Sequence, residues 1–246
     1  MHHESPLNAL PDGLPPGRLV TPEHGSDSPV MWVSDQRLPD AGRHWRRLFE
    51  LRDKTGLYPL LLNSLEGNPG RPWHDGELAA APIGAIDALT AENVLIGFWT
   101  SDARGPWPGL APPGVSDRDP DTAAMLLAES LGSACPPLLG LVPATRGADT
   151  LTLCGWTGPC NHTDETEDIS VVVRSWEERF GARVVTVGYD TLELSVAAPP
   201  TTREHAHQVA AEHEAFSPDT IWQGCGDFED YAEELIGSGH WSFWWD

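Results

Sequence analysis

Lysine is almost missing from this chain of 246 residues. Lys54 is the only lysine, so 14 of the 15 basic residues are arginine, against 37 Asp and Glu. The formal net charge of −22 argues against a surface that attracts nucleic acid or an anionic membrane. The acidity is concentrated in residues 141–246, which hold 19 acidic and 5 basic side chains. A solvated acidic surface is the commonest explanation of such a charge, and a basic protein partner is the alternative.

Long apolar runs are also missing. No stretch approaches the roughly 20 apolar residues of a membrane span. The N-terminus lacks the basic and apolar regions of a signal peptide. We therefore expect a cytoplasmic protein that does not bind membranes. In that compartment the four cysteines are expected as reduced thiols and not as a disulfide framework; they are Cys135, Cys154, Cys160 and Cys225.

Common catalytic and cofactor motifs do not occur in the sequence either. It contains neither the phosphate-binding patterns GxxxxGKS and GxxxxGKT nor the nucleophile pattern GxSxG. We therefore predict no cofactor. The sequence by itself defines neither a reaction nor a substrate.

Tryptophan, in contrast, is abundant, with 11 in the chain and three of them in the C-terminal HWSFWWD. As a strand, this segment points Trp241, Phe243 and Trp245 to one face and Ser242 and Trp244 to the other. We expect the three odd-numbered aromatics to pack on helices and to hold the C-terminus in place. Trp244 then faces either the N-terminal half of the chain or a binding partner.

Changes in composition divide the chain into three parts. Residues 1–28 are rich in proline, glycine and polar groups and are expected to be poorly ordered or draped over the surface. Residues 29–137 are predicted to form a smaller α/β unit, which begins with the strand PVMWVSD, a helix from about Asp40 and the strand LYPLLL. The segment CPPLLGLVPATRGAD marks the boundary to a C-terminal unit over residues 138–246.

The C-terminal unit is predicted to run strand, helix, strand, strand, helix, helix, strand. TLTLCGW is the first predicted strand, ARVVTVGYDTLELSVAAPP is a predicted hairpin, and HWSFWWD is the last strand. This order matches a ferredoxin-like split βαβ unit with one added helix, in which HWSFWWD pairs beside TLTLCGW. The predicted fold class is therefore α+β, with the ferredoxin-like unit packed on the N-terminal unit.

Six blocks of the C-terminal half carry a resemblance: GWTGPCNHT, VVRSWEERFGARVV, YDTLELSVAAPP, AAEHEAFSPD, IWQG and WSFWWD. Together and in this order they resemble the bacterial family of the domain of unknown function 4253, over about residues 138–246. The resemblance implies a bacterial cytoplasmic protein and brings no catalytic residue with it. In the family pattern a cysteine often precedes the Pro-Asp pair that is Pro218-Asp219 here, so Ser217 argues against thiol chemistry at this position.

The loop CGWTGPCNHTDETED is the first candidate for a site, because it joins a predicted strand to the N-terminus of a predicted helix. It offers Trp156, Asn161 and His162 as binding residues, together with Trp244 from the C-terminus. The ordinary explanation of the loop is a Gly/Pro turn that caps the helix. Its acidic residues would repel a phosphate from the helix N-terminus.

A second candidate follows the helix predicted from Thr201. His213 would act there as a general base toward Ser217 one turn later, with Asp219 nearby. The sequence shows neither an orienting group nor an oxyanion hole for such a site. A buried, hydrogen-bonded histidine is the ordinary alternative for His213, because it lies on the apolar stripe of the helix.

A metal site would use Cys154, Cys160 and His162, with Cys225 as a further ligand. The spacing lacks the paired CxxC or HxxxH geometry of ordinary zinc sites. Cys154 also falls in a predicted strand, where a free cysteine usually fills the core. We therefore favour no metal.

These observations predict a non-catalytic binding or interaction module for a basic protein partner or a small molecule. The alternative is an enzyme, either a hydrolase or a metal-assisted catalyst. Its site would lie between the Trp156–His162 loop and the His213–Asp219 segment.

Overall fold

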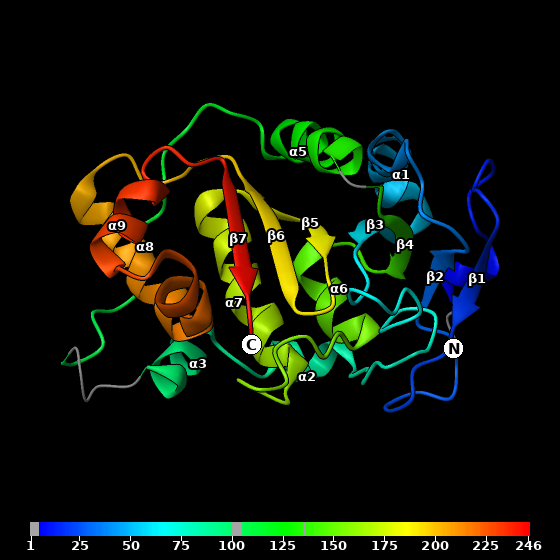
Figure 1. The fold of residues 1–246 in the computed structure, drawn as a ribbon, viewed down its shortest axis with the longest axis horizontal. Coiled ribbons are helices and arrows are strands. Elements are labelled where there is room, and N and C mark those ends of the chain that lie inside the picture. Colours follow the sequence, from blue (N-terminus) through cyan, green and yellow to red (C-terminus); the bar gives the residue numbers. More distant parts are fainter. Residues whose placement is uncertain (1–4, 100–104, 135) are drawn as a thin grey trace.

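One mixed sheet of seven strands organises the computed structural model, which describes residues 5–99, 105–134 and 136–246. Its strand order is β1-β2-β4-β3-β5-β6-β7 (Figure 1). The β3–β5 pair is parallel, and every other neighbouring pair is antiparallel. The strands are β1 (Gly17–Val20), β2 (Met31–Ser34), β3 (Leu57–Leu62), β4 (Leu138–Pro143), β5 (Ala182–Val187), β6 (Thr191–Val196) and β7 (His240–Trp244).

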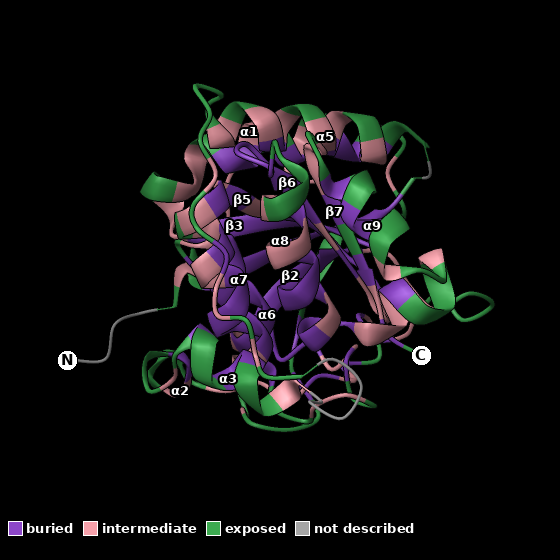
Figure 2. Cartoon of the chain, turned by 90° about the vertical axis from the view of Figure 1, so that its left-hand side faces the viewer, coloured by how far each residue is buried: buried purple, intermediate pink, exposed green. Residues whose placement is uncertain are grey.

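Helices cover both faces of the sheet, so the fold is α+β. Helices α1 (Ala41–Thr55) and α5 (Pro120–Ala134) lie on one side, and α6 (Gly147–Cys154) and α7 (Thr166–Phe180) lie on the other (Figure 2). The remaining α-helices of the described residues are α2 (Ile83–Asp87), α3 (Ala91–Phe98), α8 (Arg203–Phe216) and α9 (Phe228–Leu235). None of the described helices is long and apolar enough to cross a membrane.

The predicted elements of the first half are confirmed where they depend on local patterns. Helix α1 begins after Asp40 and ends at Gly56, whose φ of 67° is a left-handed conformation that glycine adopts without strain. Strand β3 is the predicted LYPLLL and is buried along its whole length. Residues 5–28 include β1, which pairs with β2 at one edge of the sheet, so this part of the N-terminal segment is ordered.

The segment CPPLLGLVPATRGAD, predicted as the boundary between the two halves, forms part of the sheet. It contains β4, which lies between β2 and β3 and pairs with both. One continuous sheet therefore includes strands from both halves of the sequence. Helix α5 of the first half also packs against β5 and β6 of the second.

The predicted strand TLTLCGW is wrong, because residues 147–154 form α6. Its buried Ala148, Leu151 and Cys154 recur every three residues and lie on one face of a helix. Gly155, at φ 76°, ends the helix. A short apolar run that fits both the two-residue spacing of a strand and the three-residue spacing of a helix does not distinguish the two.

The ferredoxin-like strand order is also wrong. The predicted hairpin of β5 and β6 is confirmed, but β7 pairs with β6. Strands β5, β6 and β7 therefore lie side by side in chain order, and β3 separates β5 from β4. Since TLTLCGW is helical, it offers β7 no strand to pair with.

The aromatic side chains of the C-terminus pack as the alternation predicts. Trp241, Phe243 and Trp245 are buried. Phe243 stacks on Trp176 of α7 at 5.2 Å between ring centroids, and Trp245 lies edge-on to Phe216 of α8 at 5.3 Å. These contacts hold the last strand against the helix layer.

Candidate functional site

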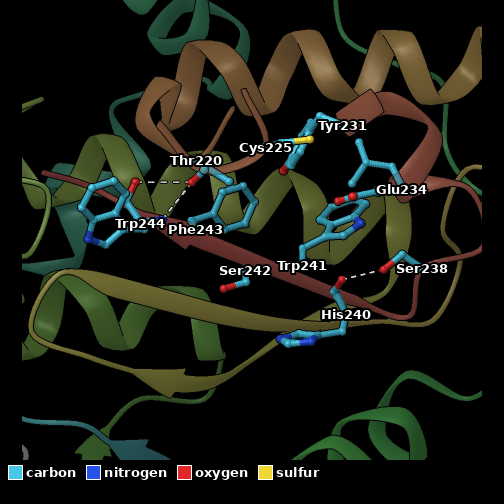
Figure 3. Close-up of a pocket in the computed structure, with 12 residues that line it drawn as sticks. Thr220, Cys225, Tyr231, Glu234, Ser238, His240, Trp241, Ser242, Phe243 and Trp244 are labelled. Atoms are coloured by element: carbon cyan, nitrogen blue, oxygen red, sulfur yellow. Dashed lines mark hydrogen bonds between the residues drawn. The ribbon is translucent and has the colours of Figure 1, made fainter. Parts of the chain in front are cut away.

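A groove of about 520 Å³ runs beside β7, at the edge of the sheet (Figure 3). Its other walls are α9 and a short π-helix, η2 (Thr220–Cys225). The groove is lined by Thr220, Gly224, Cys225, Tyr231, Glu234, Leu235, Ser238, His240, Trp241, Ser242, Phe243 and Trp244.

The backbone of β7 forms the floor of this groove. Trp241 and Phe243 point to one side of the strand and His240 and Ser242 to the other (Figure 3). All four line the groove, so the groove lies along the outer edge of the strand, where both sets of residues are reached through the backbone.

Hydrogen bonds at Trp244 show which backbone groups face outward. Its N–H donates to Thr220 Oγ1 at 2.9 Å, and its carbonyl accepts from Ser217 Oγ at 2.8 Å. Backbone groups alternate in direction along a strand. The N–H and C=O of Ser242, two residues earlier, therefore also point away from β6 and toward the groove.

Helix α9 supplies the opposite wall. Asp227 caps its N-terminus by accepting hydrogen bonds from the N–H groups of Glu229 and Asp230. Tyr231 and Leu235 are buried, whereas Glu234 is exposed at the groove. Burial raises the pKa of the Tyr231 phenol, and the neighbouring Cys225 and Glu234 add to the shift. Tyr231 is therefore a neutral side chain of the wall.

His213 lies behind this wall and is fully buried. Its Nδ1 is 2.9 Å from the Tyr231 hydroxyl, and its ring meets Trp241 edge-on at 4.5 Å between centroids. Its Nε2 is buried and has no hydrogen-bond partner among the residues that the structure describes. Burial, with a smaller contribution from the Arg179 charge, lowers the pKa of His213 well below 6.5. The imidazole is therefore neutral and joins α8 to α9.

This burial predicts a loss of stability in mild acid. Below pH 6.5 the unfolded chain binds a proton at His213 that the folded chain excludes, so the free energy of unfolding falls with pH until the folded-state pKa is reached. His213→Gln removes the effect. Between pH 6 and 5 the free energy of unfolding of this variant should fall less steeply than that of wild type. The two slopes should differ by up to about 1.4 kcal/mol per pH unit. Urea unfolding at pH 5, 6, 7 and 8 measures both slopes.

The exposed His24 provides the matched control. His24→Gln should keep the wild-type slope. Equal slopes for wild type and His213→Gln would contradict the exclusion of the proton from the folded state.

The structure does not bring His213, Ser217 and Asp219 together as a catalytic set. Ser217 Oγ donates to the Trp244 carbonyl and lies 2.8 Å from Thr220 Oγ1. The Asp219 carboxylate accepts from the N–H of Asp246 and from Gln223 Nε2. The reason is local: α8 ends at Phe216, so Ser217 no longer continues the helical face on which His213 lies.

The loop residues proposed for binding are placed in different contacts. Trp156 is buried, and its Nε1 donates to the Gly188 carbonyl at 2.8 Å. Asn161 Nδ2 donates to the carbonyl of Asp246 at 2.6 Å. Both side chains therefore attach the loop to other parts of the fold.

His162 lies in a second cavity of about 380 Å³, between the loop and the end of α8. Its ring is tilted against Phe98 at 4.4 Å, and burial lowers its pKa. This cavity lies in the region predicted for an enzyme site, between the Trp156–His162 loop and the His213–Asp219 segment. Of the side chains proposed for that site, His162 lines it, and His213 and Ser217 do not.

Two of the predicted site residues line the groove beside β7: Trp244, proposed for binding, and Cys225, named as a further metal ligand. Trp244 is half-buried, and its Nε1 lies 3.3 Å from Asp190 Oδ2. Sequence reasoning missed Thr220, Tyr231 and Glu234, which come from separate elements. The capping Asp227 was a signal for α9, but no local pattern showed that α9 faces the edge of a strand.

The cysteines proposed as metal ligands differ in their surroundings. Cys154 is buried in α6, and burial raises the pKa of its thiol to about 12. Cys160 is exposed. Within residues 5–99, 105–134 and 136–246, no group of three His, Cys, Asp or Glu residues is arranged to hold a metal ion. Cys135 lies outside the described residues.

A known family matches the part of the chain that contains the groove. Residues 138–246 form a domain of the family described as Domain of unknown function (DUF4253). All residues that line the groove beside β7 fall within this domain. No curated protein and no solved structure matches the chain.

Proposed function

We propose that the protein is a non-catalytic binding module that holds a segment of a basic protein partner in the groove beside β7. The outward-facing backbone of Ser242, set between β7 and the wall of α9, is the observation that carries the proposal. Edge strands with exposed backbone groups are recurrent sites of protein recognition. The contacts of Ser217, His213 and Asp219 with neighbouring backbone and side chains give them structural roles in shaping this groove.

Charge supports a basic partner. Glu234 is the acidic residue of the lining, which includes neither lysine nor arginine. The half of the chain that contains the groove also carries most of the net negative charge. An acidic field of this kind speeds the encounter with a basic partner and disfavours an acidic one.

Gly224 allows the groove to be filled without disturbing its walls. A Cβ at this position would have only the Asp219 carbonyl oxygen within 4 Å, at 3.8 Å, and its backbone does not require glycine. Gly224→Phe should therefore fold normally and weaken binding of an arginine-rich peptide at least about tenfold, because the ring occupies the groove. Fluorescence anisotropy with a labelled nine-residue peptide of alternating threonine and arginine measures the affinity.

Gly84 of α2 provides the matched control, since a Cβ there would meet nothing within 4 Å. Gly84→Phe should bind the peptide like wild type. If the peptide does not bind wild type, or if Gly224→Phe binds as tightly as Gly84→Phe, the proposed function is wrong.

A further inference from the structure

Resting on the proposed function, we infer that the partner segment binds as an added β-strand along His240–Ser242 and directs a lysine or arginine side chain at the wall of α9. The groove then selects its partner both by a main-chain contact and by the charge of one side chain.

The open part of the β7 edge is short and has defined ends. At Trp244, the hydroxyls of Thr220 and Ser217 occupy the outward N–H and C=O. At the other end, Ser238 Oγ donates to the carbonyl of His240 at 2.7 Å. The Ser242 N–H and C=O lie between these two capped positions. A partner segment therefore gains its main-chain hydrogen bonds at the centre of the groove.

Protection of the edge is the competing explanation of these hydroxyl caps. Proteins commonly cover edge strands to prevent pairing with other chains. Such caps would leave Ser242 facing a solvent-filled groove that has no ligand. The two explanations differ in whether the Ser242 backbone pairs with a peptide that enters the groove.

Side chains of an added strand alternate between the two sides of the sheet. Those on the side of Trp241 and Phe243 face α9, where Leu235 and Tyr231 present apolar surface and Glu234 presents a carboxylate. A lysine or arginine matches this wall, because its aliphatic stem packs on apolar groups while its charged end reaches an acid.

Glu234 lies near Ser238 and Trp241, at the end of the groove where β7 begins (Figure 3). Arg118 lies beside Gly239, since a Cβ there would be 3.2 Å from Arg118 Nη1. We therefore expect the cationic side chain beside Glu234 and not beside Gly239.

Backbone methylation of the threonine–arginine peptide tests strand addition. One version carries N-methyl groups on all threonine amides and a second on all arginine amides. In an added strand only alternate N–H groups face the neighbouring strand. We expect one version to lose at least about tenfold in affinity, as a lost set of hydrogen bonds implies. The other version should bind within about threefold of the parent peptide.

Glu234→Lys tests the side-chain preference. Glu234 is exposed, so the variant should fold. It should weaken binding of the threonine–arginine peptide at least about fivefold, and it should strengthen binding of a second nine-residue peptide in which glutamate replaces every arginine. Glu66→Lys changes the same charge on an exposed turn away from the groove and should leave the preference unchanged.

The outcomes separate the two proposals. If Gly224→Phe abolishes binding but both methylated peptides bind like the parent, or both lose binding equally, strand addition is wrong and the binding groove stands. If Glu234→Lys and Glu66→Lys behave alike, the proposed side-chain preference is wrong. If Gly224→Phe has no effect on binding, the groove itself is not the site.

Discussion

A chain that ends at Gly239 is expected not to fold. It lacks Trp241, Phe243 and Trp245, which are buried against α7 and α8. Truncation of one buried aromatic side chain costs about 3–5 kcal/mol, and the three together approach or exceed the total stability of a typical domain, about 5–15 kcal/mol. Because the sheet is continuous, the loss should unfold both halves of the chain. Circular dichroism and thermal unfolding measure the result.

A chain that lacks only Asp246 is the control. Asp246 is exposed and contributes hydrogen bonds to Asp219 and Asn161, each worth about 1 kcal/mol. This variant should fold and unfold cooperatively. A soluble, cooperatively melting chain that ends at Gly239 would show that the aromatic strand is dispensable.

The second large effect is expected at Glu212, a fully buried carboxylate of α8. It accepts hydrogen bonds from Arg179 Nη1 and Nη2, at 2.7 and 2.6 Å, and from Trp176 Nε1 at 2.8 Å. It also accepts from the N–H of Ala111 at 2.6 Å. The carboxylate thereby joins α7, α8 and the segment that follows α3.

Glu212→Gln should destabilise the fold by about 3–5 kcal/mol, because it leaves the Arg179 guanidinium without its buried counter-charge. The amide also replaces one acceptor oxygen by a donor that faces other donors. Urea unfolding at pH 7 measures the loss. Glu204→Gln, on the exposed first turn of the same helix, should cost less than about 1 kcal/mol. Equal stabilities of the two variants would contradict a structural role of the buried ion pair.

Local patterns predicted much of the fold correctly. The alternation of apolar residues in ARVVTVGYDTLELSVAAPP indicates the hairpin of β5 and β6, and the apolar stripe from Ile169 to Phe180 indicates α7. Both patterns depend on neighbours within a few residues. The pairing of β7 and the insertion of β4 depend on contacts between distant segments, and no local spacing determines them.

The candidate site was less predictable for the same reason. Trp244 was identified because alternation separated it from Trp241 and Phe243. Thr220 and Glu234 reach the groove only because η2 and α9 fold back along β7. The expected proximity of His213 and Ser217 assumed that α8 continues, and its end at Phe216 turns Ser217 toward the strand edge instead.

The hydrogen-exchange rate of the Ser242 amide tests most directly whether the β7 edge is the binding site. The rate is measured with and without a saturating amount of the threonine–arginine peptide. Pairing of the Ser242 N–H with an added strand predicts that exchange slows at least about tenfold, while exchange at the distant Gly84 does not change. An unchanged rate at Ser242 while the peptide is bound would contradict binding at this edge.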